Sequence, residues 1–129
     1  MTARGPALLF ANAAIRLGYG IAVLVAPSKP LGGKVPLAPD TDELPEARLF
    51  VRGFSTHQAA VALPGLVSLV KPGLRRPAML LAAATDASDV LSAVVEGRAR
   101  GRFDADLTGG IAFSAVGLVS ALAAWRAAR

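Results

Sequence analysis

Long apolar stretches, separated by segments rich in proline, glycine or charged residues, make up most of this chain. Each stretch has about the 20 residues that an α-helix needs to cross a bilayer. The pattern predicts an all-α fold: a four-transmembrane-helix bundle with up-down-up-down topology, forming a single integral membrane domain over residues 1–129. The four predicted helices cover residues 7–26, 49–70, 77–95 and 107–125.

The connections between the predicted helices differ in character. Residues 27–47 include five prolines and a Gly-Gly pair, which predicts a long non-helical loop over one end of the bundle, between the first and second helices. The Lys-Pro-Gly sequence at 71–73 predicts a tight turn before the third helix. The last connection, 96–106, alternates basic and acidic residues, so we expect it to be solvated.

Two other interpretations of the apolar stretches stay open. The first stretch follows a short basic N-terminus and ends before a proline, as a signal peptide would. Arg16 at its middle argues against cleavage, because the core of a signal peptide is uninterrupted apolar sequence. A soluble bundle of alanine-rich helices would need polar outer faces, which the second and fourth stretches lack.

Charged residues and the single histidine interrupt three of the four stretches near their midpoints. Arg16 lies in the first, Arg52 and His57 in the second, and Asp86 and Asp89 in the third. A charge at the bilayer centre costs roughly 2.5 kcal/mol or more, so it persists only where it is paired or used. At a rise of about 1.5 Å per residue, Arg16, His57 and Asp86 share one central layer. Arg52 and Asp89 form a second layer nearer the long connection.

Residue spacing predicts which polar groups share a helix face. Asp86 and Asp89 are three residues apart and therefore lie on one side of the third helix. Asn12, Arg16 and Tyr19 form a similar stripe on the first helix. The fourth helix has no charge at its middle, and we expect close packing along its small residues, which are Gly110, Ser114, Gly117 and Ala121.

The polar residues of the second helix do not share one face. Arg52, Ser55 and Thr56 lie together, whereas His57 lies about 140° from Arg52 around the helix axis. Arg52 and His57 therefore cannot both point at one spot. Pro64, further along, is expected to bend this helix.

Composition supports a membrane location. The hydrophobic content is 53% and the mean hydropathy is +0.50, above the usual balance of soluble domains. The formal net charge of +5 comes from basic residues scattered over helix ends, and only one Trp and one Tyr could stack on bases, so we expect no nucleic-acid partner. The lack of cysteine excludes disulfides and thiolate chemistry, and one histidine argues against a zinc site.

Charge placement also predicts an orientation. Four spans place both termini on one side, and all the loop acids fall on the other side, so the terminal side is the uniformly basic face. Lys and Arg are equally numerous on the two sides, so the positive-inside rule gives a tie and only the lack of acids distinguishes the terminal side. On that ground we expect a multi-pass protein of the cytoplasmic (inner) membrane with both termini in the cytoplasm.

Three short motifs follow one another along the chain. Arg16 lies in an apolar first helix before a proline-rich connection, "RLFVRG" at 48–53 opens the second helix, and "TDASD" at 85–89 lies in the third. Together they resemble the small four-helix bacterial membrane proteins of the DUF4267 group. The resemblance covers nearly the full chain and implies a four-helix membrane fold, with no settled activity. Members of this group tend to carry an acidic residue after the second-helix arginine, whereas Gly53 follows Arg52 here.

The charged residues suggest an enzyme that works without a cofactor or metal. Two nearby carboxyl groups can divide their roles, one holding a proton as the acid and the other acting as the base. We expect Asp86 to be the base, Asp89 the acid, and Arg16 the group that orients the base, with Arg52 and His57 as further catalytic residues. The expected substrate is a lipophilic small molecule that undergoes epoxide opening, isomerisation or cyclisation, beside membrane lipid. Expected substrate contacts are Tyr19, Asn12, Thr56 and Ser88.

Two other function classes stay open at this point. A buried carboxylate that takes up and releases a proton could drive a small transporter, for which four helices would need to form a homodimer. In a structural or accessory subunit, the Arg and Asp residues would form a charge clasp that fixes which helices adjoin. Enzyme and transporter can be distinguished in detergent, where no gradient exists: only an enzyme changes its substrate chemically there.

Overall fold

The computed structural model describes residues 4–25 and 45–128, and the secondary structure over these residues is helical. The all-α prediction is therefore confirmed, with four long helices. Most of the predicted long connection at 27–47 lies outside the described residues. The elements are α1 (Arg4–Val25), α2 (Pro45–Val70), a short 3₁₀ helix η2 (Pro72–Leu74), α3 (Arg75–Arg100) and α4 (Ala105–Ala127).

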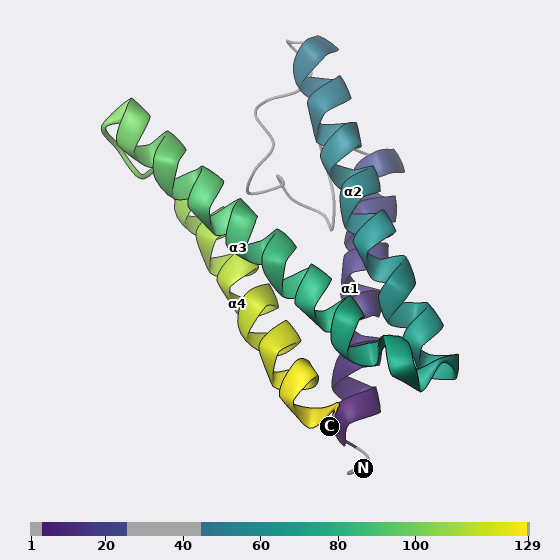
Figure 1. Cartoon of the computed structure of the whole chain (residues 1–129). Helices are drawn as coiled ribbons and strands as arrows, with labels where there is room; N and C mark the ends of the chain where they lie inside the picture. Colours follow the sequence, from purple (N-terminus) through teal and green to yellow (C-terminus); the bar gives the residue numbers. More distant parts are fainter. Residues whose placement is uncertain (1–3, 26–44, 129) are drawn as a thin grey trace.

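The helices pack as two pairs. α1 lies along α2 and α3 lies along α4, and smaller contacts between α1 and α4 and between α2 and α3 join the pairs. Figure 1 shows both chain ends at the same end of the molecule, where the pairs meet. A β-carbon added at Gly5 would lie 3.1 Å from the carbonyl oxygen of Ala127, so the first and last turns are in contact. From there the pairs diverge towards the start of α2 and the α3–α4 turn (Figure 1).

Three helical segments are long and apolar enough to cross a membrane: Gly5–Val25, Pro72–Arg100 and Leu107–Ala127. α2 is as long as α3, but its polar run at 55–58 shortens the apolar part. Large apolar side chains are exposed on all four helices, among them Phe10, Ile15, Val67, Leu91, Val116 and Val119. An outer surface of this kind is stable against lipid and is costly in water, so it supports a membrane protein.

Small residues set how closely the helices approach. A β-carbon at Gly20 would lie 2.7 Å from the carbonyl oxygen of Ser55, so α1 touches the backbone of α2 at this point. Ser114 and Ala121 of the predicted α4 seam are buried. Close packing of backbones through glycine, alanine and serine is the usual way in which helices associate in a bilayer.

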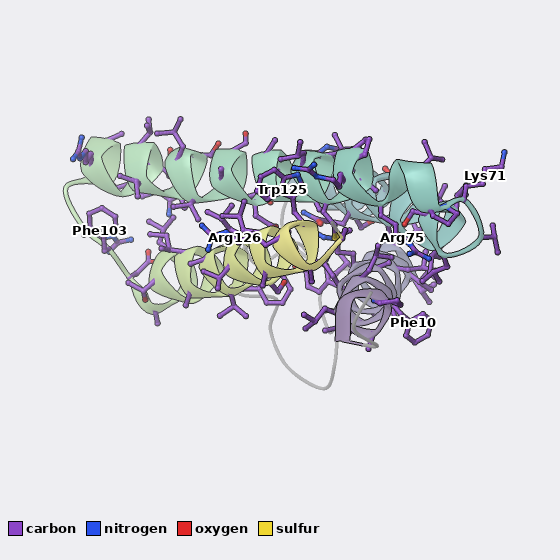
Figure 2. The ribbon with its side chains drawn as sticks, turned by 60° about the horizontal axis from the view of Figure 1, so that its bottom comes forward. Phe10, Lys71, Arg75, Phe103, Trp125 and Arg126 are labelled. Atoms are coloured by element: carbon purple, nitrogen blue, oxygen red, sulfur yellow. The ribbon has the colours of Figure 1, made fainter. Side chains whose placement is uncertain are left out.

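α3 is longer than the predicted helix at 77–95. It begins at Arg75, directly after η2, and continues to Arg100. Gly101 then ends it with a φ of 67°, a left-handed conformation that glycine adopts without strain. Phe103 lies at this end of the α3–α4 pair (Figure 2) and packs on Gly97, where a β-carbon would lie 2.3 Å from the ring.

Candidate functional site

A buried ion pair joins α1 to α3. Arg16 Nη2 donates a hydrogen bond to Asp86 Oδ2, and the two side chains are only 7% and 4% exposed. The sequence prediction that these two residues share one depth is confirmed. The pair is buried because each residue lies on the inward face of a long apolar helix, where no water could solvate a lone charge.

The Arg16 guanidinium binds groups from three helices. Its Nε donates to Asn12 Oδ1 at 3.0 Å within α1, and its Nη1 donates to Gln58 Oε1 of α2 at 2.7 Å. Nη2 also donates to the carbonyl oxygen of Ala82 at 3.3 Å, one turn before Asp86 in α3. Because a guanidinium has five N–H donors, these bonds together with Asp86 occupy most of them. Arg16 is thus a fixed junction of α1, α2 and α3.

α4 closes the network from the fourth side. Asn12 Nδ2 donates to Ser120 Oγ at 2.8 Å, and that hydroxyl donates to the carbonyl oxygen of Gly117 at 2.8 Å. A β-carbon at Gly117 would lie 2.6 Å from Asp86 Oδ2 and 3.0 Å from Oδ1. The Asp86 carboxylate therefore rests against bare helix backbone, and any side chain at position 117 would collide with it.

Asp89 lies one turn further along α3 in a more open setting. Gln58 Nε2 donates to its Oδ2 at 3.1 Å, so Gln58 connects Arg16 on one side with Asp89 on the other. Asp89 is partly exposed, whereas Asp86 is 3% exposed. Arg16, Tyr19 and His57 lie within electrostatic range of Asp89. Of the two carboxylates, Asp89 is the one that a small molecule can reach.

Tyr19 lies on the Asp89 side of the network. Its side chain is buried and its ring centroid is 5.3 Å from that of Phe113 in α4, with the two ring planes 33° apart. Phe113 is 46% exposed. The two rings therefore form an apolar contact between α1 and α4, and Phe113 brings it to the outside of the bundle.

Of the other predicted site residues that the structure describes, Ser88, Thr56 and His57 are exposed and make no hydrogen bond to this network. The Thr56 hydroxyl donates to the carbonyl oxygen of Gly53 within its own helix. Arg52 belongs to α2, but its side chain lies outside the described residues. His57, which the depth argument placed in the central layer, is exposed.

Gln58, the next residue along α2, is buried at the depth predicted for His57. Ser55 and Gln58, three residues apart, are 0% and 4% exposed, and the same face of α2 continues through Ala62 and Gly65. His57 lies about 100° from Gln58 around the axis, which turns its ring out of the helix contact. His57 therefore has the predicted depth but lies on a different face of α2 from the buried residue, Gln58.

Three members of the network are not among the predicted site residues: Gln58, Gly117 and Ser120. The sequence carried a signal for Gln58, because a buried glutamine can serve an arginine and a carboxylate at once and Ser55 marks its helix face. Gly117 was predicted only as part of a packing seam. No signal in the sequence links it to Asp86, since that contact depends on how α3 and α4 cross.

The arrangement suits proton transfer on an organic molecule. Among the described residues, no three His, Cys, Asp or Glu side chains gather to hold a metal ion. What the site offers is a reachable carboxylate, a tyrosine hydroxyl and a fixed positive charge that acts on Asp89 through Gln58. A carboxylate and a tyrosine hydroxyl at one site are groups that can remove one proton and supply another.

Fold and site together define a helical protein with membrane-length helices and a polar network at its centre. No family model, curated protein or solved structure matches the chain.

Proposed function

We propose that this chain is an integral membrane enzyme that carries out cofactor-free acid–base chemistry on a lipophilic small molecule: epoxide opening, isomerisation or cyclisation. The observation that carries the proposal is the contrast between the two carboxylates. Asp86 is sealed by Arg16 and Gly117, whereas Asp89 is partly exposed and keeps one described hydrogen bond, from Gln58. Ionisable groups within membrane helices that are not fully paired are typical of functional sites.

The contrast changes the roles expected from the sequence. Asp89, in place of Asp86, is the reacting base, because a substrate can approach it without breaking the ion pair. Gln58 is a positioning residue that holds the Asp89 carboxylate and is itself held by Arg16. Tyr19 is the proton donor, and its packing with Phe113 provides apolar contact for the substrate.

Epoxide hydrolysis illustrates how these groups would act. Asp89 accepts a proton from water as the water oxygen forms a bond to one epoxide carbon and the bond from that carbon to the ring oxygen breaks. Tyr19 gives its proton to the released oxygen, which yields a diol. The proton on Asp89 then returns to the Tyr19 oxygen, so both groups regain their starting states.

The membrane arrangement is part of the proposal. All four helices, α2 included, cross the inner membrane in an up-down-up-down order with both termini in the cytoplasm. The end that holds both chain termini is the only uniformly basic one, which favours the cytoplasmic side for it. A lipophilic substrate would enter from the bilayer between α1 and α4, where Phe113 is exposed. The resemblance to the DUF4267 group fits this arrangement.

A structural or accessory subunit is the second candidate. It is favoured by the hydrogen bonds of Arg16, which reach α1, α2 and α3 and leave little of the guanidinium for a substrate. In that case Asp89 would meet a partner helix or stay idle, and no variant would alter any conversion.

A conversion assay in detergent tests the enzyme proposal. Purified protein is incubated with a panel of lipophilic epoxides and polyenes, and products are followed by mass spectrometry. We expect conversion by the wild type and at least a hundredfold slower conversion by Asp89→Asn, because general-base catalysis contributes about 10²–10⁴-fold. Glu96→Gln, which removes an exposed carboxylate from the same helix, is the matched control and should convert normally.

Two results would contradict the proposal. A folded Asp89→Asn protein that converts substrate at the wild-type rate would remove Asp89 from the reaction. Unchanged substrates across the panel, together with their movement across vesicle membranes that contain the protein, would establish a transporter.

A further inference from the structure

The end of the molecule that holds both chain termini carries a cluster of basic side chains. Lys71, Arg76 and Arg126 are exposed there, and Arg75 is partly buried, with its Nε donating to the carbonyl oxygen of Ser68 at 3.2 Å. Figure 2 shows Lys71 and Arg75 where α2 turns into α3, with Lys71 pointing away from the bundle, and Arg126 at the end of α4. Lys71 lies in the turn between α2 and η2, Arg75 and Arg76 belong to the first turn of α3, and Arg126 belongs to the last turn of α4.

No acidic side chain among the described residues offsets this basic end. The opposite end differs, because Arg100 there pairs with Glu96 at 2.5 Å and approaches Asp104 at 3.9 Å. The two ends therefore differ: oppositely charged side chains pair near the α3–α4 turn, whereas the described charged side chains near the termini are basic.

Trp125 marks one place within the basic end. The Arg76 guanidinium carbon lies 4.7 Å from the centre of the indole ring, a cation–π contact between α3 and α4. The indole Nε1 is shielded from solvent and donates to no acceptor among the described residues. The part of this Arg76–Trp125 pair that a ligand can reach is therefore the Arg76 guanidinium, since Arg76 is exposed.

We propose that Arg76 and Trp125 form a binding site for the phosphate-containing head group of an anionic phospholipid. The exposed Arg76 guanidinium supplies charge and hydrogen bonds to the phosphate oxygens, the Trp125 ring holds the guanidinium in place, and Lys71 and Arg126 add positive charge to this end. The head group therefore binds where Arg76 of α3 contacts α4.

The position of the site identifies a lipid rather than free phosphate. Arg76 and Trp125 lie at the ends of the segments Pro72–Arg100 and Leu107–Ala127, both long enough to span a bilayer, so the site lies at the level of the lipid head groups. Tryptophan beside arginine at a helix end is the arrangement found at membrane interfaces. A head group bound here has its acyl chains beside the exposed apolar faces of α3 and α4.

Intrinsic fluorescence gives a direct test, because Trp125 is the only tryptophan in the chain. The full-length protein in a neutral detergent is titrated with short-chain phosphatidylglycerol, with short-chain phosphatidylcholine and with inorganic phosphate. We expect a saturable change in emission with phosphatidylglycerol alone, which weakens as salt is added. Arg76→Gln should reduce the apparent affinity about fivefold, since one cation near an anionic head group contributes about 1 kcal/mol.

Arg98→Gln is the matched control, since it removes the same charge from the exposed surface at the other end of α3. It should bind phosphatidylglycerol like the wild type. Equal weakening by Arg98→Gln would mean that only net charge matters, and an equal response to phosphatidylcholine would exclude head-group recognition. Saturation by inorganic phosphate at the same concentration would assign the site to the free anion. The wild-type comparison of the three ligands decides the proposal even if Arg76→Gln does not fold.

Discussion

Replacing Gly117 by alanine places a methyl group where α4 meets the Asp86 carboxylate. The new β-carbon would lie 2.6 Å from Asp86 Oδ2, 2.9 Å from Cγ and 3.0 Å from Oδ1. All three atoms belong to a carboxylate that Arg16 holds in place, so relief requires either a shift of the ion pair or a wider separation of α3 and α4. The change is small in volume but falls on the least tolerant contact of the network.

The magnitude follows from two opposing terms. Overpacking a filled interior costs about 1–3 kcal/mol. Alanine in place of glycine within a helix returns about 0.5–1 kcal/mol by lowering the entropy of the unfolded chain. The two terms leave a net loss of about 0–2.5 kcal/mol. Any hydrogen bonding lost between Arg16 and Asp86 adds to this loss, so the melting temperature should fall by several degrees.

The assay is thermal unfolding of the purified protein in one detergent, with Gly18→Ala as the matched control. Gly18 is also in the interior of an apolar helix, and a β-carbon added there meets no atom within 4 Å. Gly18→Ala should be as stable as the wild type or more stable. If Gly117→Ala behaved in the same way as Gly18→Ala, Asp86 would not rest against α4 and the described network would be incorrect.

Three further predictions concern the same network. Asp86→Leu alone leaves the Arg16 charge buried and unpaired, and should lower the free energy of unfolding by about 3–5 kcal/mol. The double variant Arg16→Met/Asp86→Leu should recover most of that loss in the same unfolding assay. A double variant as unstable as the single one would mean that the two residues act independently. Gln58→Leu should lower stability by about 1–3 kcal/mol because it removes hydrogen bonds to both Arg16 and Asp89. Wild-type stability of this variant would show that these two hydrogen bonds do not stabilise the protein. His57→Leu should change stability by less than about 0.5 kcal/mol, because this ring is exposed, and a larger loss would place His57 in the core after all.

The sequence predicts the depth of the site along the helices better than it predicts which residues form the site. Arg16 and Asp86 could be placed in one layer from the sequence because a helix rises by a constant amount per residue, but which arginine pairs with which aspartate could not be predicted. The choice between His57 and Gln58 could not be made in this way, since both have nearly the same depth. That choice depends on which face of α2 meets α1, and the close contact of Gly20 with the backbone of Ser55 fixes it.

Helix ends show a second limit of the sequence. The charged stretch after position 95 was expected to be a solvated connection, yet α3 continues through it to Arg100. Exposed charged residues are compatible with a helix surface as well as with a loop. Gly101 was the informative residue, because a glycine directly after basic residues is typical of a helix C-terminus. The contact of Gly117 with Asp86 arises from the crossing of two helices, which no local pattern encodes.

In this account Asp86 has a structural role and Asp89 has a chemical one. The most direct test is to measure the melting temperatures of Asp86→Asn and Asp89→Asn side by side in the same detergent. Asp86→Asn weakens the buried ion pair with Arg16, so its melting temperature should fall by several degrees. Asp89→Asn should melt at or above the wild-type temperature, because a partly paired carboxylate kept for chemistry contributes little to stability. An Asp89→Asn protein destabilised as much as Asp86→Asn would contradict the account and make both carboxylates parts of one structural clasp.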